Sequence, residues 1–219
     1  METHRIAILV PAYNEEGTIA SVIKGAIKYG EVFVVDDGST DTTASVAKES
    51  GATVLSSGSN LGYDSALAFG YQSLIPMGFF AIITMDADGQ HIHSDIPKFI
   101  DSLRKGCDAV IGSRPSKARA MERVFGLIVF SLWRIEDPLC GMKGFTVRLL
   151  IQKPAIATYK SVGTELLMFA LASGLKVESV NIQSRDRIDQ SRFAGAFRSN
   201  ALILSALLIG IAKTYRWSK

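Results

Sequence analysis

The chain has 219 residues, of which 47% are hydrophobic and 21% are charged. This length and composition are typical of a folded globular domain with a sizeable core, and they argue against a disordered protein. The 24 basic and 21 acidic side chains give a net charge of +3, yet residues 185–219 alone carry seven Lys/Arg and two Asp, or +5. The basic residues lack interleaved stacking aromatics, which argues against nucleic acid as a partner. The basic excess at residues 185–219 leaves three interpretations: contact with an anionic membrane, binding of a phosphate-bearing substrate, or simply a solvated surface.

Short apolar runs alternate with amphipathic stretches through the first half of the chain. They predict strands at residues 6–10, 31–35, 53–56, 80–85 and 109–112, and helices at residues 15–29, 41–50, 65–74 and 96–105. After residue 114 the pattern predicts a helix at 122–133, a loop entering another element at 141–150, a helix at 165–172 and a last strand at 176–182. Alternating strands and helices are typical of a mostly parallel sheet, so the sequence predicts an α/β fold.

Two features bear on the cellular compartment. Cys107 and Cys140 are far apart and show no metal-ligand spacing. The apolar run at residues 6–10 is too short, and too soon followed by Pro11, for a secretory signal peptide. We therefore expect reduced thiols in a cytoplasmic protein.

The final part of the chain contains a strongly apolar stretch at residues 200–212. This helix of about 13 residues is shorter than the ~20 residues needed to span a bilayer. Cationic and aromatic residues flank it, namely Arg198, Lys213, Tyr215, Arg216, Trp217 and Lys219. Such a helix is typical of a membrane interface, and the alternative is packing on the core or on a second copy in a homo-oligomer. We expect a main domain at residues 1–195 and an apolar helix within residues 196–219.

Two carboxylates, Asp86 and Asp88, follow the predicted strand at residues 80–85 and precede Gln90. In open α/β sheets, ligands bind at the carboxyl ends of the strands, where this pair would lie. Mg²⁺ usually takes one or two carboxylates together with substrate phosphates. The alternative is an ordinary acidic turn, because Asp and Gly are common in turns. The motif suggests a metal held against a diphosphate if the other strand ends complete a nucleotide site.

Suitable residues do follow the other predicted strands. Pro11-Ala12-Tyr13-Asn14-Glu15 follows the first strand, Asp36-Asp37-Gly38-Ser39 the second, and Asn60-Leu61-Gly62 the third. Together with Asp86-Ala87-Asp88, this ordered set resembles the family 2 inverting glycosyltransferases, and the resemblance covers roughly residues 5–195. The resemblance implies a GT-A nucleotide-sugar-binding fold, which is Rossmann-like with helices flanking a mostly parallel sheet.

The resemblance also implies roles for individual residues. The nucleotide-sugar donor would contact Pro11, Tyr13, Glu15, Asp37, Gly62 and Asp86. Mg²⁺ or Mn²⁺ would be held on the diphosphate by Asp86, Asp88 and Gln90. In the family the Asn-x-Gly triplet is often followed by Lys and Gly. This chain has Tyr63 and Asp64 there, so it departs from that pattern and has no lysine at that point to contact a phosphate.

Later motifs resemble the polyprenyl-phosphate branch of the family, exemplified by dolichyl-phosphate mannose synthase. They are residues 110–114, Arg123, residues 137–145 and the basic cluster at residues 185–192. In that branch a hexose passes from a GDP- or UDP-sugar to the phosphate of a membrane-embedded isoprenoid. The residues that would contact the acceptor phosphate are Arg114, Arg123, Lys143, Arg185, Arg187 and Arg192. The phosphate-binding role in the last cluster falls to either Arg185 or Arg187.

Acceptor chemistry favours the same interpretation on independent grounds. A sugar hydroxyl must lose a proton during attack and so needs a positioned base. A phosphate monoester has a second pKa near ~6 and is mostly dianionic at neutral pH, so it needs cations instead. Arg suits phosphate because it presents paired donors. Asp137 fits either chemistry, as a base for a hydroxyl or as an organiser of Lys143 and the arginines.

Three functional hypotheses follow. The first is a metal-dependent inverting glycosyltransferase that makes a polyprenyl-phosphate-linked hexose at the cytoplasmic face of a membrane, with Asp88, Asp137 and Arg114 as the catalytic residues. The second is a transferase of the same fold with a saccharide hydroxyl as acceptor. The third is a non-catalytic nucleotide-sugar-binding protein. The residues that contact the base do not distinguish a GDP-sugar from a UDP-sugar.

Overall fold

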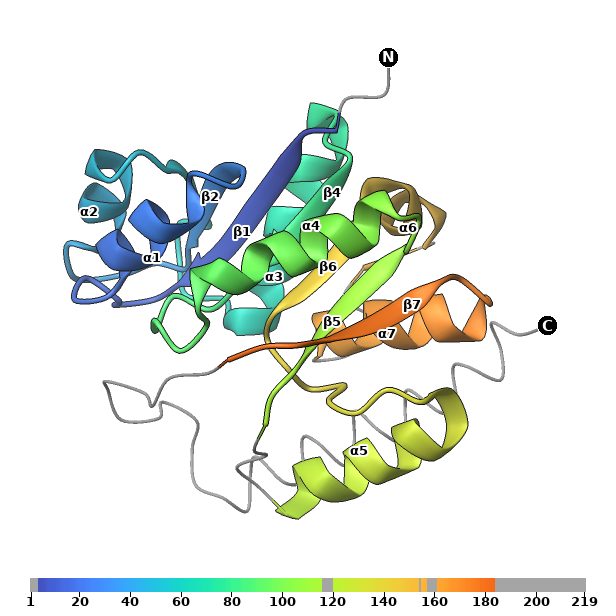
Figure 1. Cartoon of the computed structure of the whole chain (residues 1–219). Helices are drawn as coiled ribbons and strands as arrows, with labels where there is room; N and C mark the ends of the chain where they lie inside the picture. Colours follow the sequence, from blue (N-terminus) through green and yellow to red (C-terminus); the bar gives the residue numbers. More distant parts are fainter. Residues whose placement is uncertain (1–3, 116–119, 154, 157–160, 184–219) are drawn as a thin grey trace.

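A seven-stranded sheet forms the centre of the computed structural model, which describes residues 4–115, 120–153, 155–156 and 161–183 (Figure 1). The strand order is β3-β2-β1-β4-β6-β5-β7, and every neighbouring pair is parallel except the two pairs that involve β6. The strands are β1 (Ile6–Ala12), β2 (Glu31–Asp36), β3 (Thr53–Ser56), β4 (Ala81–Thr84), β5 (Ala109–Ser113), β6 (Lys143–Thr146) and β7 (Val177–Asn181). The expected α/β fold with a mostly parallel sheet is confirmed.

Helices cover both faces of this sheet. They are α1 (Ile19–Ala26), α2 (Thr43–Glu49), α3 (Tyr63–Leu74), α4 (Ile96–Arg104), α5 (Ala120–Trp133), α6 (Val147–Gln152) and α7 (Val162–Ala172), with short 3₁₀ turns η1 (Ile75–Met77) and η2 (His93–Asp95). In Figure 1, α4 crosses in front of the sheet, while α3 and α7 lie behind it.

The two layers follow from the alternation of side chains along buried strands. Ile6, Ile8 and Val10 of β1 pack in one apolar cluster with α1, α2 and α4. Ala7 and Leu9 pack in the other cluster, with α3, α6 and α7. Because successive residues of a strand point to opposite faces, a strand covered on both sides must be apolar throughout. This explains why the strands in the first half of the chain could be predicted from continuous apolar runs in the sequence.

The region around residues 141–150 differs most from the expectation of a loop entering another element. It contains β6, which is antiparallel to both β4 and β5, followed directly by α6. The four residues of β6 read Lys-Gly-Phe-Thr and contain no apolar run, so periodicity could not reveal the strand. Its direction matters for function, because its first residue, Lys143, lies at the edge where the parallel strands end.

The ends of β1 and α1 also differ from the sequence expectations. Pro11 and Ala12, expected to follow the first strand, belong to β1 and pair with Val35 and Asp36 of β2. Proline is tolerated there because the pairing of β1 with β4 ends at Leu9, so the missing N–H costs no bond on that side. The helix expected over residues 15–29 is reduced to α1 at Ile19–Ala26, and the remaining elements start and end within about three residues of their predicted ends.

The two cysteines and the helices bear on the remaining expectations. Cys107 and Cys140 are both free and buried. No helix among the described residues is long and apolar enough to cross a membrane. The apolar stretch at residues 200–212, and with it the proposed division at residue 195, lies outside the described residues.

Candidate functional site

The candidate site lies at one edge of the sheet, where the parallel strands end and β6 begins. Strand pairing places Leu9, Thr84, Lys143 and Ile111 side by side across β1, β4, β6 and β5. The loops that leave these strands therefore emerge at the same edge. They bring together two polar loops after β1 and β2, the acidic turn after β4, and an arginine after β5.

The loops after β1 and β2 are joined by hydrogen bonds. Asn14 has a φ of +53°, and its side-chain oxygen accepts the Thr40 N–H at 2.8 Å. The Glu15 N–H donates to the Thr43 hydroxyl at 2.7 Å. Tyr13, between them and β1, is half-buried. The buried carboxylate of Glu15 accepts from the hydroxyl of Thr18 at 3.1 Å, so it helps to hold the turn that precedes α1.

Asp37 organises a third loop, at residues 57–62. One of its carboxylate oxygens accepts the Leu61 N–H at 2.8 Å, and the other accepts the Gly62 N–H at 2.8 Å. The neighbouring Gly38 has a φ of +73°, and a Cβ there would lie 2.7 Å from the backbone nitrogen of Asn60. A side chain at residue 38 would therefore push this loop away. Asp37 acts on the loop that carries Gly62, in addition to any contact it makes with a donor.

Replacing Asp37 by Asn is expected to weaken this loop. An amide supplies only one acceptor oxygen, so its NH₂ group would face the N–H of Leu61 or Gly62. These two N–H groups are only partly buried, so losing one hydrogen bond to the carboxylate costs about 1.5 kcal/mol, the lower end of the range for a charged acceptor. If the loop forms part of the donor site, the KM for the nucleotide sugar should rise about tenfold, which corresponds to ~1.4 kcal/mol. The D37N variant should be compared with D101N, which changes an exposed Asp on α4; equal KM values would show that the loop does not serve the donor.

The acidic turn after β4 is held by its own backbone and by β6. The Thr84 hydroxyl donates to the carbonyl oxygens of Gly141 and Lys143 at 3.1 and 3.2 Å. The Asp86 N–H donates to Nδ1 of the buried His91 at 3.0 Å, so the ring proton of neutral His91 is on Nε2. The Gln90 N–H donates to Asp88 Oδ1 at 3.0 Å. This arrangement places the Asp86 and Asp88 carboxylates and the Gln90 amide in one short turn.

Two neighbours of Asp86 come from distant parts of the chain. The Tyr63 hydroxyl donates to Asp86 Oδ1 at 2.9 Å. On the other side, a Cβ on Gly141 would lie 2.4 Å from Asp86 Oδ2. Although 41% of Tyr63 is exposed, burial of its hydroxyl, followed by the charge of Asp86, raises the pKa of Tyr63 well above its usual value. The hydroxyl therefore stays protonated at physiological pH and donates a hydrogen bond to Asp86.

A buried ion pair follows β5. Arg114 Nε and Nη2 donate to the two carboxylate oxygens of Asp137 at 2.7 and 3.0 Å. The Asp137 side chain is 2% exposed and that of Arg114 23%. The Arg114 N–H also donates to Asp137, at 3.3 Å. Asp137 thus holds the guanidinium in one orientation, with part of its surface still open to solvent.

Lys143 brings a second cation to this edge. Its side chain is buried, and Nζ donates to the carbonyl oxygen of Cys140. Burial lowers the pKa of Lys143, whereas the charges of Asp137 and Asp86 act in the opposite direction. Lys143 pairs with Thr84 of β4 on one side and with Ile111 of β5 on the other, so it lies between the strand before the acidic turn and the strand before Arg114. Burial also raises the pKa of the Cys140 thiol to about 12, so this thiol is not a nucleophile at neutral pH.

The structure describes the other predicted cationic residues only in part. Arg123 belongs to α5, but its side chain lies outside the described residues, as do Arg185, Arg187 and Arg192 entirely. Among the described residues, no group of three or more His, Cys, Asp or Glu side chains surrounds a possible metal position. The two carboxylates and the Gln90 amide would therefore need oxygen atoms from a substrate or water to complete a coordination shell.

Sequence reasoning missed the roles of Tyr63, Asp64 and Gly141. Tyr63 and Asp64 were noted only as departures from a familiar pattern, yet Tyr63 contacts Asp86, and Asp64 accepts the Val162 N–H at the start of α7 at 2.7 Å. Gly141 lies against the Asp86 carboxylate. The only sequence signal for the first two was the missing Lys-Gly, because contacts over 20 or more residues leave no local pattern.

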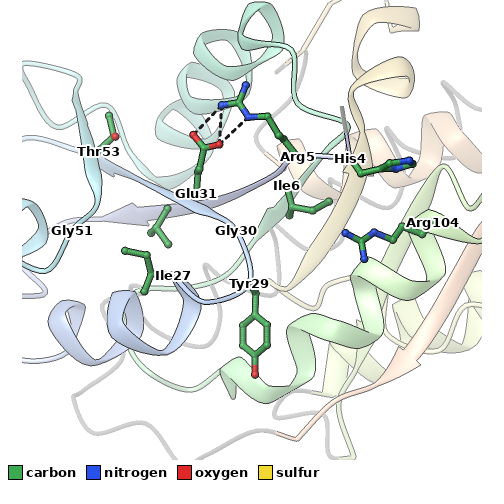
Figure 2. Close-up of a pocket in the computed structure, with 11 residues that line it drawn as sticks. His4, Arg5, Ile6, Ile27, Tyr29, Gly30, Glu31, Gly51, Thr53 and Arg104 are labelled. Carbon is green, nitrogen blue, oxygen red and sulfur yellow. Dashed lines mark hydrogen bonds and ion pairs between the residues drawn. The ribbon is translucent and has the colours of Figure 1, made fainter. Parts of the chain in front are cut away.

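A separate cavity of about 470 Å³ lies at the opposite edge, where β1, β2 and β3 begin (Figure 2). Local contacts account for the presence of its two arginines. Arg5 pairs with Glu31 at 2.8 Å and lies 4.4 Å from the centre of the Phe79 ring, while Arg104 is in the last turn of α4, where a cation is favoured. None of the predicted site residues lines this cavity.

Comparison with known proteins gives three informative similarities. Residues 7–134 match the family model described as Glycosyl transferase family 2. An uncharacterised protein of Methanocaldococcus jannaschii is 33% identical over 198 residues, covering 82% of this chain and 81% of that protein. The dolichyl-phosphate hexose transferase of Haloferax volcanii is 29% identical over 206 residues, covering 87% of this chain and 88% of the relative.

A solved structure with a similar fold carries ligands. It is the crystal structure of glucosyl-3-phosphoglycerate synthase from Mycobacterium tuberculosis in complex with Mn²⁺, UDP and phosphoglyceric acid. The two proteins superpose with a TM-score of 0.74 and 26% sequence identity, covering 94% of this chain and 78% of the other.

Proposed function

Because the chain belongs to glycosyltransferase family 2, we propose that it transfers a hexose from a nucleotide diphosphate sugar to a polyprenyl phosphate. The reaction forms a bond between an acceptor phosphate oxygen and the anomeric carbon, and it breaks the bond between that carbon and the diphosphate oxygen. The nucleotide diphosphate leaves with both bonding electrons. One in-line displacement inverts the anomeric centre and requires no covalent enzyme intermediate.

The loops after β1, β2 and β3 and the acidic turn form the proposed donor half of the site. Pro11, Tyr13, Glu15, Asp37 and Gly62 are the proposed contacts to the nucleotide. The UDP bound in the glucosyl-3-phosphoglycerate synthase structure supports a nucleotide site in this fold. The choice between a GDP-sugar and a UDP-sugar is part of the test below.

The residues of the acidic turn fit a divalent cation. Asp86, Asp88 and Gln90 offer the hard oxygen ligands that Mg²⁺ and Mn²⁺ prefer. Gly141 lies so close to Asp86 Oδ2 that a Cβ there would clash with the carboxylate, and the structurally similar synthase was crystallised with Mn²⁺. When bound, the cation neutralises the charge that develops on the leaving diphosphate. Asp86 and Asp88 would hold it, and Lys143 lies near the same edge, where it pairs with Thr84 at the end of β4.

The Arg114–Asp137 pair is the observation that favours a phosphate acceptor. Both carboxylate oxygens of Asp137 already accept hydrogen bonds from Arg114, so Asp137 serves better as an organiser of this cation than as a base for a hydroxyl. A dianionic phosphate needs no base, but it must be bound and separated from water. We assign this role to Arg114, with Lys143 and with Arg123, Arg185, Arg187 and Arg192 as further candidates. The similarity to a dolichyl-phosphate hexose transferase supports the same acceptor class.

The lipid acceptor implies contact with a membrane surface. We propose that the apolar stretch at residues 200–212 and its basic and aromatic flank make this contact. The acceptor phosphate would then reach the site at the cytoplasmic face. Binding of the full chain to anionic liposomes, compared with a chain ending at residue 195, tests this part of the proposal.

A transfer assay tests the whole proposal. Purified full-length protein is incubated with Mn²⁺ and radiolabelled UDP- or GDP-hexoses, with and without a short-chain polyprenyl phosphate. Label that enters the organic phase for one donor, only when the lipid is present, is the expected result and identifies donor and acceptor together.

Parallel reactions address the alternatives. Phosphoglyceric acid is included because the structurally similar synthase binds it, and simple saccharides represent hydroxyl acceptors. Label in either of these products, with none in the lipid, would contradict the polyprenyl phosphate assignment. Absence of both transfer and donor hydrolysis would favour a nucleotide-sugar-binding protein.

A further inference from the structure

Tyr63 is joined to a proposed metal ligand although it lies 23 residues away in the sequence. It is the first residue of α3, and its hydroxyl donates to Asp86 Oδ1 at 2.9 Å. We propose that Tyr63 is a positioning residue that fixes the Asp86 carboxylate for binding of the divalent cation. This inference rests on the proposed function of the acidic turn, and it adds a residue that the sequence did not suggest.

The backbone around Tyr63 is anchored on both sides. The Gly62 N–H donates to Asp37 Oδ2 at 2.8 Å, which ties the start of α3 to the loop after β2. The next residue, Asp64, accepts the Val162 N–H at 2.7 Å, which ties the same turn to α7. Tyr63 therefore projects from a turn held by two separate elements, as a group that orients another side chain should.

Asp86 is confined on its other side by Gly141. A Cβ at residue 141 would lie 2.4 Å from Asp86 Oδ2 and 3.0 Å from its Cγ. The carboxylate thus occupies the space between the Tyr63 hydroxyl and the Cα of Gly141. The Tyr63 hydroxyl contacts Oδ1, and Gly141 packs closely against Oδ2 because it has no Cβ. These two contacts together hold the carboxylate in one orientation.

The chemistry of the phenol suits this role. A lysine at this position would place a full positive charge beside a cation-binding carboxylate, and the two cations would repel each other. The neutral hydroxyl of Tyr63 orients the carboxylate without that repulsion.

A direct measurement of metal binding tests the inference. Free Mn²⁺ is quantified by electron paramagnetic resonance while it is titrated into wild type and Y63F with saturating UDP or GDP, whichever the wild type binds. Loss of the hydrogen bond lets the carboxylate leave the orientation that binds metal, so we expect about tenfold weaker Mn²⁺ binding in Y63F. Transfer by Y63F should approach the wild-type rate at saturating Mn²⁺, which a general structural defect would not allow. Y29F is the matched control, because Tyr29 lines the cavity at the opposite edge.

A second variant, G141A, changes the contact on the other side of the Asp86 carboxylate. In G141A the new methyl group would displace the carboxylate, and Mn²⁺ binding should again weaken about tenfold or more. Unchanged Mn²⁺ affinity in Y63F or in G141A would overturn the inference. Failure of the proposed function looks different, because wild type would then bind no Mn²⁺ with the nucleotide and D88N would change nothing.

Discussion

Replacing Asp88 by Asn is expected to abolish sugar transfer almost completely. Asp88 is 8% exposed and lies in the turn after β4, two residues after Asp86. Removal of its charge takes away a proposed metal ligand and with it much of the stabilisation of the leaving diphosphate. A loss of ~4 kcal/mol in the transition state corresponds to about a thousandfold in kcat/KM. The measurement is transfer of labelled hexose at several Mn²⁺ concentrations.

The substitution preserves the shape of the turn, because an Asn side chain can still accept the Gln90 N–H through its oxygen. The melting temperature of D88N should therefore stay close to that of wild type. D101N is the control, since it makes the same chemical change on the exposed surface of α4. Near-normal transfer by D88N would contradict the assignment of the acidic turn as the metal site.

Replacing Arg114 by Lys is the second change with a large expected effect. Lysine keeps the charge beside the buried Asp137 carboxylate but loses the paired donors that match a carboxylate or a phosphate. Transfer to polyprenyl phosphate should fall about a hundredfold, equivalent to ~3 kcal/mol. Binding of the nucleotide sugar should not change, because Arg114 follows β5, away from the nucleotide loops. The measurements are kcat/KM for the acceptor and the Kd for the donor.

Arg148 offers a closely matched control. It pairs with the buried Asp108, as Arg114 pairs with Asp137, but its side chain is 69% exposed and it belongs to α6. R148K should transfer at the wild-type rate. D137N gives the complementary result: partial loss is expected if Asp137 only orients Arg114, and complete loss with intact donor binding would instead indicate a base for a hydroxyl acceptor. A fall in R148K equal to that in R114K would show that the effect is on stability.

Features of the fold that depend only on residues close together in the sequence could be predicted from the sequence. The strand at Thr53–Ser56 has the boundaries expected from its pattern, and the ends of α4 were predicted within one residue. Strands covered on both faces need continuous apolar residues, which is a local property of the chain. β6 could not be predicted in this way, because Lys-Gly-Phe-Thr becomes a strand only between two others already in place.

The candidate site shows the same division. The fold class and the acidic turn with its two carboxylates could be predicted from residue types at short spacing, and the ordered motifs carried the resemblance to the family. The partners of these groups became known only from the folded arrangement: Arg114 for Asp137, the loop at residues 57–62 for Asp37, and Tyr63 for Asp86. The folded arrangement also places Lys143 at the site edge, because β6 runs antiparallel. Such contacts join residues 20 or more positions apart, and packing of the whole sheet, not local preference, selects them.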